Sequence, residues 1–285
     1  QGSCSAWAMA YYCYGYQEAK DNGWTDAGTN PAHQISPAWA YNRVSGGEDK
    51  GTWMEAVADV LNDWGAATMA TMPYDETNLW YWGSEEAFRE APPHRSWEPV
   101  PLAYEGDVTI QNIKALLAEG IPVTFAMTSS NLQFRDNFVL SSKEYSVGDA
   151  DHAQTFVGYD DTIMEGGERG AFKVVNSWGT GFGDGGFYWL TYEAVKKIGD
   201  RGTLHLTYVR DQEDYEPTTL LVWHFDGAPD QAAEIKASTG TVVLMPMYNQ
   251  GQMAYRVQMP SFMLLDVSDL TASSGQPLTL SVKGM

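Results

Sequence analysis

Cysteine is scarce in this chain of 285 residues, which holds only Cys4 and Cys13. Two cysteines cannot form the disulfide framework that stabilises small secreted domains, so a hydrophobic core must hold this fold. Within one regular helix, their spacing of nine residues places them about half a turn out of phase and roughly 13 Å apart along the axis, too far for a bridge. We therefore predict two free thiols and interpret Cys13 as an inert core residue.

Positive charge is also scarce. The chain has 17 Lys and Arg against 37 Asp and Glu, a formal net charge of −20. Such a surface repels phosphates, so we expect neither nucleic acid nor an anionic membrane as a partner. No apolar run reaches the ~20 residues that span a bilayer, so we expect no membrane insertion. The 44% of hydrophobic residues predicts one large domain, or one domain with a small appendage.

The chain begins with an apolar stretch, residues 4–19, in which Ala, Trp, Met and Tyr fall on all sides of a helix. A helix that is apolar all round belongs inside a domain, and Gly23 is a natural place for it to end. Cys4 would lie at its N-terminus, where the helix dipole favours a thiolate. A buried cysteine is more often a plain core residue, so this position alone does not identify a nucleophile.

Helical patterns come first in the chain, and strand patterns follow. The predicted helices are one after the Ser36–Pro37 cap, one from a Thr52–Glu55 capping box to Gly65, one near 85–89 and one at 107–119. The predicted strands are 121–127, 153–159, 171–177, 186–192, 204–209, 218–225, 241–247, 254–257 and 278–282. This order indicates an α+β fold in which a helical half packs on a sheet-rich half. We predict a first domain over residues 1–210 and a β-rich extension, or small β-sandwich, over residues 211–285.

Two short polar stretches lie at strand ends, where core packing does not require polar side chains. One precedes the predicted strand 153–159, and the other ends the predicted strand 171–177. His152 lies in Asp149–Ala153, and Asn176 opens the run Asn-Ser-Trp-Gly. A cysteine nucleophile needs a nearby base, and an imidazole base needs a partner that fixes its tautomer. His152 lies 148 residues after Cys4 and 24 before Asn176, which fits the spacing of a papain-type pair. Each residue alone is more often structural; the three together favour catalysis.

The order Cys4, then Asp151-His152-Ala153, then Asn-Ser-Trp-Gly resembles the papain-like cysteine peptidases, in the form common among bacteria. The run 176–187 carries the most specific part of this resemblance, which covers roughly residues 1–195. It implies a two-lobed fold with a helical lobe and an antiparallel β lobe. The roles it implies are nucleophile for Cys4, general acid and base for His152, imidazole orientation for Asn176, a water shield for Trp178 and substrate-backbone pairing for Gly51 and Thr52.

Three positions depart from the family pattern. Thr52 stands where the family usually has glycine, Ser5 where tryptophan often follows the cysteine, and Phe182 where a second tryptophan is usual. The family's second oxyanion donor is a glutamine about six residues before the cysteine, which here would precede Gln1. We therefore expect a propeptide or another upstream segment; without one, the oxyanion hole would be incomplete, which could lower the rate by ~10²–10³-fold.

The resemblance implies a cysteine endopeptidase that cleaves peptide or protein substrates through a thioester acyl-enzyme, without cofactor or metal. An exopeptidase or amide transferase on the same scaffold stays open, as does an inactive papain-like binding or adhesion module. Acidic pairs such as Asp149 with Asp151 and Asp160 with Asp161 could hold calcium, but a solvated loop is the more common arrangement. The acidity and the family together lead us to expect a secreted or cell-surface protein.

Overall fold

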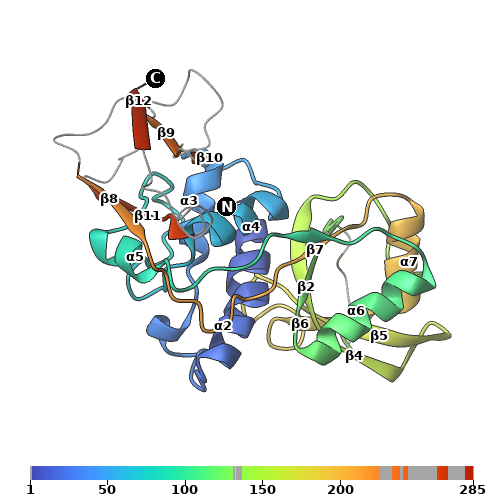
Figure 1. Ribbon diagram of the computed structural model, residues 1–285. Coiled ribbons are helices and arrows are strands. Elements are labelled where there is room, and N and C mark those ends of the chain that lie inside the picture. Colours follow the sequence, from blue (N-terminus) through green and yellow to red (C-terminus); the bar gives the residue numbers. More distant parts are fainter. Residues whose placement is uncertain are drawn as a thin grey trace.

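The computed structural model describes residues 2–130, 132, 137–224, 233–237, 240–242, 262–268 and 280–284. Figure 1 shows one half of the molecule made mostly of helices and the other half made of a sheet with two helices beside it, with the N-terminal helical run between the halves. The predicted α+β, two-lobed, papain-like architecture is confirmed. The strand predicted at 254–257 lies outside the described residues.

The N-terminal helical run consists of α1 (Cys4–Ala6), η1 (Trp7–Tyr14) and α2 (Gly15–Asp21). A buried helix in this place was predicted correctly, but the prediction of regular winding is wrong. The eight residues of η1 form a π-helix, which has wider turns than an α-helix. This segment contacts α3 and α4 on one side and β2 and β4 on the other, so it lies where the two halves meet.

The helical half continues with η2 (Pro31–His33), α3 (Pro37–Ser45), α4 (Met54–Trp64) and α5 (Glu85–Glu90). The predicted start of α3 is confirmed, because the Ser36 hydroxyl accepts a hydrogen bond from the backbone N–H of Trp39 at 3.3 Å. The predicted capping box is wrong. Helix α4 has Trp53 at its N-cap and no side-chain cap, and the Thr52 carbonyl instead accepts a hydrogen bond from Ser5.

The other half is a seven-stranded sheet in the order β1-β7-β2-β4-β5-β6-β3. Its strands are β1 (Val100–Pro101), β2 (Val123–Met127), β3 (Val139–Leu140), β4 (His152–Glu165), β5 (Glu168–Val175), β6 (Phe187–Thr191) and β7 (His205–Tyr208). The lobe was predicted to be antiparallel, which holds for every pair except β3 and β6. Those two strands run parallel, so the sheet is mixed.

Two helices pack on this sheet. Helix α6 (Asp107–Glu119) contacts β2 and β4, and its bounds are those predicted. Helix α7 (Tyr192–Asp200) contacts β5 and β6 and was not predicted. Its sequence signals were present, because the Thr191 hydroxyl caps its first turn and buried Val195 and Ile198 have helical spacing.

The register of the sheet brings its two predicted catalytic residues together. Strand β4 begins at His152, which pairs with Met127 on β2. Strand β5 runs antiparallel to β4, with Thr155 opposite Val175, the last residue of β5. His152 and Asn176 therefore lie side by side at one edge of neighbouring strands, although 24 residues separate them.

After residue 210 the described elements are all strands. Strand β8 (Leu220–His224) pairs with β11 (Phe262–Asp266), and β9 (Ala233–Ala237) pairs with β10 (Gly240–Val242) and β12 (Leu280–Gly284). Strands β8, β10 and β12 overlap predicted strands, whereas β9 and β11 were not predicted. Strand β11 contacts α4 and α5, and a buried ion pair of 3.2 Å joins Arg95 to Asp266. The domain division at residue 210 stays a prediction.

Candidate active site

The imidazole of His152 is held by the side chain of Asn176. The Nε2–H of His152 donates to Oδ1 of Asn176 at 2.8 Å. Both residues are buried, with 7% and 2% of their surface exposed. The same Oδ1 accepts the backbone N–H of Ser177 at 2.7 Å, and the Asn176 N–H donates to the Gly186 carbonyl at 3.0 Å. Asn176 is thus fixed at both its backbone and its side chain.

Cys4 lies on the other side of the imidazole. It is the first residue of α1, is partly exposed, and forms no disulfide. Its thiol hydrogen-bonds the His152 side chain and the backbone of Ala153. Because Asn176 already engages Nε2, the nitrogen left to face the thiol is Nδ1. The structure thus brings Cys4, His152 and Asn176 together in one row.

The pKa values of the thiol and the imidazole are shifted toward each other. Burial alone would raise the pKa of Cys4, but the hydrogen bond to His152, the Ala153 backbone and the His152 charge together bring it below its ordinary value. Burial alone would lower the pKa of His152, but its hydrogen bonds to Cys4 and Asn176 and the thiolate charge raise it. These shifts favour a thiolate beside an imidazolium, the reactive form of a cysteine nucleophile.

Trp178 covers this pair on its outer side. Its ring stacks on the imidazole of His152, with ring centroids 4.8 Å apart and planes 25° apart. Phe182 meets the same indole edge to face at 4.9 Å. Trp178 is 47% exposed, so one part of its ring faces solvent while it stacks on the imidazole. Its role as a water shield stays a prediction.

The thiol and the imidazole open into a cleft of about 680 Å³. Gly51 and Thr52, predicted to bind substrate, lie on its wall, as do Trp53 and His205. The cleft is lined by Cys4, Ser5, Lys50, Gly51, Thr52, Trp53, Met54, Ala126, Asp149, Ala150, Asp151, His152, Ala153, Gly202, Thr203 and His205. A groove of this volume can bury several residues of an extended peptide.

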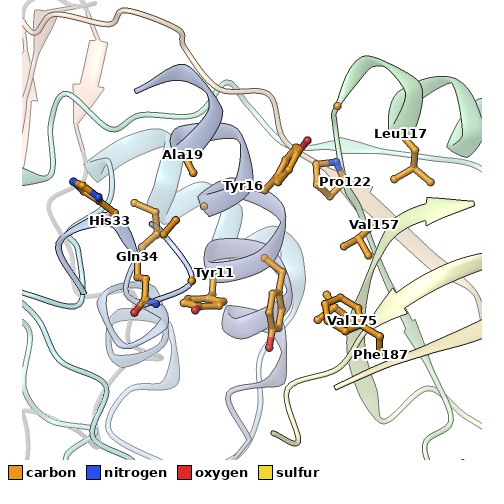
Figure 2. A pocket seen from close by; sticks show the side chains of 16 residues that line it. Tyr11, Tyr16, Ala19, His33, Gln34, Leu117, Pro122, Val157, Val175 and Phe187 are labelled. Atoms are coloured by element: carbon orange, nitrogen blue, oxygen red, sulfur yellow. The ribbon is translucent and has the colours of Figure 1, made fainter. Parts of the chain in front are cut away.

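A second pocket, of about 350 Å³, contains none of the three candidate catalytic side chains. Figure 2 shows it between Tyr11 and Tyr16 of the helical run and Val157 and Val175 of the sheet. One residue of its lining reaches the active site, because the hydroxyl of Tyr12 donates to the Asn176 carbonyl at 3.3 Å. We interpret this pocket as the seam between the two halves.

Some contributors to the site were not predicted. The Ala153 backbone, the Tyr12 hydroxyl and the Ser5 hydroxyl all contact candidate active-site residues or the cleft wall. A backbone group carries no sequence signal, and the partner of Tyr12 depends on how the two halves pack. Ser5 did carry a signal, since it replaces the tryptophan usual in the family, but its partner could not be read from the sequence.

One of the two acidic pairs considered for calcium, Asp160 with Asp161, has other partners. Asp161 forms an ion pair with Lys114 at 2.7 Å and accepts a hydrogen bond from Tyr192. Asp160 accepts hydrogen bonds from the backbone and hydroxyl of Thr162. Within the described ranges, no three His, Cys, Asp or Glu residues gather in a way that could hold a metal ion. None of the helices in that part of the chain is both long and apolar enough to span a membrane.

Comparison with known proteins gives one family. The sequence model described as "Papain family cysteine protease" matches residues 39–203. That range includes His152, Asn176 and Trp178 and begins after Cys4. An uncharacterized peptidase C1-like protein of Acanthamoeba polyphaga mimivirus is 26% identical over 204 residues, which cover 68% of this chain. The chain spans 63% of the length of that relative.

Solved structures of cysteine proteases share the fold. Xylellain from Xylella fastidiosa has 21% identity and a TM-score of 0.57, covering 73% of this chain and 79% of its own. Clostridial Cwp84, solved after propeptide cleavage, has 14% identity and a TM-score of 0.51, covering 99% and 82%. Bromelain from Ananas comosus, in complex with the inhibitor E64, has 17% identity and a TM-score of 0.50, covering 73% and 89%.

Proposed function

The chain belongs to the papain family of cysteine proteases, and we propose that it is an endopeptidase that cleaves peptide bonds through a thioester acyl-enzyme. The observation that carries this proposal is the row of Cys4, His152 and Asn176 at the cleft, with the pKa of the thiol lowered and that of the imidazole raised. A structural cysteine would not need an oriented imidazole beside it.

The reaction follows from this row. The Cys4 thiolate attacks the scissile carbonyl carbon, and the bond formed is C–S. The His152 imidazolium gives its proton to the leaving amine as the C–N bond breaks, which leaves a thioester. Water then attacks the thioester while His152 takes one of its protons, and the acid product leaves as the C–S bond breaks. Asn176 keeps the imidazole ring oriented through both steps.

Negative charge develops on the carbonyl oxygen when the thiolate attacks. Cys4 is the first residue of α1, so its backbone N–H has no acceptor within the helix. We propose this N–H as one donor to the oxyanion.

The experiment that tests this function combines labelling with product analysis. An epoxysuccinyl thiol inhibitor should add once to the wild-type protein and not to Cys4→Ala, as read by intact mass. Digestion of a peptide library should then yield internal cuts. Release of terminal residues alone would instead indicate an exopeptidase, and transfer to an added amine an amide transferase. A folded wild-type protein that takes no label would indicate an inactive binding module.

We also propose that residues 1–210 form the peptidase unit and residues 211–285 its β-rich extension. The buried Arg95–Asp266 pair supports a fixed attachment between them. Limited proteolysis should leave a stable fragment that ends near residue 210 and retains the epoxysuccinyl label. A propeptide and a secreted or cell-surface location are proposed from the family and from the net charge of −20. Detection of the mature protein only inside the source cells would contradict the location.

A further inference from the structure

One wall of the active-site cleft is a short irregular segment, residues 49–53, which we call the wall segment. It lies between α3 and α4 and has neither helical nor strand hydrogen bonding. Four of its residues, 50–53, line the cleft. Irregular backbone of this kind needs hydrogen bonds from elsewhere to keep a fixed position. Here the donors come from the residues on either side of Cys4.

The first attachment is at Gly2. Its backbone N–H donates to the Asp49 carboxylate, which also accepts the Tyr41 hydroxyl at 3.1 Å. The backbone at Gly2 approaches the wall segment so closely that a Cβ on Gly2 would lie 2.6 Å from the Gly51 nitrogen. Only glycine fits at position 2 without moving the wall segment. The hydrogen bond from Gly2 also lowers the pKa of Asp49, so this carboxylate stays ionised as an acceptor.

The second attachment is at Ser5, the residue that directly follows Cys4. Its hydroxyl donates to the Thr52 carbonyl at 2.6 Å, and Ser5 is 4% exposed. This hydroxyl also lies near the Cys4 sulfur, where it contributes to the lowered pKa of the thiol as its smallest cause. A hydroxyl has one hydrogen to donate. The short bond to Thr52 assigns that hydrogen to the wall segment.

We propose that Ser5 is a positioning residue that sets the distance between the cleft wall and the Cys4 sulfur. The proposal rests on the proposed function, because it concerns how a bound peptide meets the thiolate. A peptide docked along Gly51 and Thr52 can present its carbonyl to Cys4 only if the wall stays in place. Since Ser5 directly follows Cys4 in the chain, its hydrogen bond to Thr52 fixes the position of the wall segment relative to Cys4.

Ser3 provides a matched control. It also adjoins Cys4, is 2% exposed, and has a hydroxyl that hydrogen-bonds the Tyr74 hydroxyl at 2.7 Å. Unlike that of Ser5, its hydroxyl pairs with Tyr74 rather than with the wall segment, and Ser3 does not line the cleft. Ser3→Ala and Ser5→Ala therefore each remove one buried hydroxyl next to Cys4. Only Ser5→Ala also removes the hydrogen bond to the wall segment.

The test compares two reagents that reach the same sulfur. Iodoacetamide is too small to use the wall, whereas a peptidyl epoxysuccinate must dock along it. For Ser5→Ala we expect the second-order rate with the peptidyl reagent to fall about tenfold, the factor of one lost hydrogen bond, and the iodoacetamide rate to change less than about twofold. On a peptide substrate, the loss should appear mainly in KM. Ser5→Thr, which keeps the hydroxyl, should restore the ratio of the two rates.

Three results would overturn the proposal. One is an equal fall of both rates in Ser5→Ala, which would indicate lost stability or a changed thiol. Another is an alkaline shift of the pH profile of iodoacetamide labelling in Ser5→Ala that accounts for the whole fall in the peptidyl-reagent rate. That result would show that the Ser5 hydroxyl acts by stabilising the thiolate. The third is the same change of ratio in Ser3→Ala. If the wild-type protein cleaves peptides and Ser5→Ala keeps the wild-type ratio of the two labelling rates, only this inference is refuted. If Cys4 of the wild-type protein reacts with neither reagent, the proposed function is refuted.

Discussion

The two cysteines of one helical run, Cys4 at its start and Cys13 in its middle, have opposite chemistry. Cys4 is partly exposed, and the hydrogen bond and charge of His152 outweigh its burial and lower its pKa. Cys13 is fully buried, donates to the Pro122 carbonyl at 3.1 Å, and has its pKa raised to about 12 by burial. The amino acid and the helical run are the same in both cases. What sets Cys4 apart is an oriented imidazole beside its thiol and an open side toward a cleft, which supports the proposal that it is the nucleophile.

The same contrast extends to the neighbouring ionisable groups. At Cys4, the thiol is set to transfer its proton to His152. Near Cys13, the buried Tyr14 hydroxyl donates to the carboxyl groups of Glu18 and Asp211. Burial and the Glu18 charge raise the pKa of Asp211 to about 8. The surroundings of Cys4 therefore favour ionisation of its thiol, whereas burial disfavours ionisation of Cys13 and Asp211.

The largest expected effect separates the two cysteines directly. Cys4→Ala should lower kcat/KM on a peptide substrate by at least ~10⁴-fold, since the acyl-enzyme cannot form. Cys13→Ala should leave kcat/KM within about twofold, because its methylene and sulfur lie in the core and its thiol takes no part in the reaction. Steady-state assays of both variants at one pH provide the comparison. Comparable losses of kcat/KM in Cys4→Ala and Cys13→Ala would contradict the different roles given to the two cysteines.

The next effect concerns the orientation of His152. Asn176→Ala should lower kcat by ~10²-fold, because a general base that is no longer held spends little time in reach of the thiol. Since the hydrogen bond to Asn176 helps to raise the pKa of His152, its loss should move the alkaline limb of the pH–rate profile to lower pH. A variant with an unchanged alkaline limb would show that Asn176 does not act on the imidazole.

A smaller effect is expected at the ring that shields this bond. Trp178→Ala should reduce kcat/KM by about three- to tenfold, because water then competes for the His152–Asn176 hydrogen bond. Trp178→Phe keeps an aromatic face toward the imidazole and should recover most of the activity. Because Trp178 is 47% exposed, the melting temperature should be nearly unchanged. A large fall in melting temperature would indicate a role in the core.

The smallest effect tests whether Asp211, which faces the helical run, stays protonated in the folded protein. A carboxyl with a raised pKa stabilises the fold below its unfolded pKa and loses this contribution as the pH rises through about 8 for Asp211. Wild-type stability should therefore decline between about pH 4 and pH 8, the interval between the unfolded and the folded pKa of this carboxyl. In Asp211→Asn, whose amide can still donate toward Glu18, the decline should be smaller by about 1–2 kcal/mol after allowance for the partial exposure of this carboxyl. Thermal unfolding across this pH range measures the difference, and parallel curves for the two proteins would contradict it.

The sequence predicted the fold class and the catalytic candidates because both depend on local or family-specific patterns. Apolar periodicity located α6 to the residue, and a cap with proline located the start of α3. The row of Cys4, His152 and Asn176 followed from residue order, before any contact between them was visible. The parallel pair β3–β6 was not predictable, because a two-residue strand carries no periodicity.

Other errors have specific physical causes. The π-winding of η1 escaped prediction because Ala, Trp and Tyr are compatible with either winding, and the packing of both halves on this segment decides it. Thr52 and Glu55 have the pattern of a capping box, yet tertiary contacts compete for both. Ser5 donates to the Thr52 carbonyl, and Thr207 on β7 donates to the Glu55 carboxylate. Local preference was overridden by long-range hydrogen bonds.

The central claim is that His152 turns Cys4 into a thiolate. The pH dependence of iodoacetamide alkylation at Cys4, followed by peptide mass in the wild type and in His152→Ala, tests it most directly. In the wild type we expect rapid alkylation already near pH 6, where the thiolate is paired with the imidazolium, and none at Cys13 in the folded protein. In His152→Ala the rate should rise only at or above the pH of an ordinary thiol ionisation, ~8.5, because the burial that remains raises the pKa of Cys4. Identical profiles in the two proteins would contradict the account.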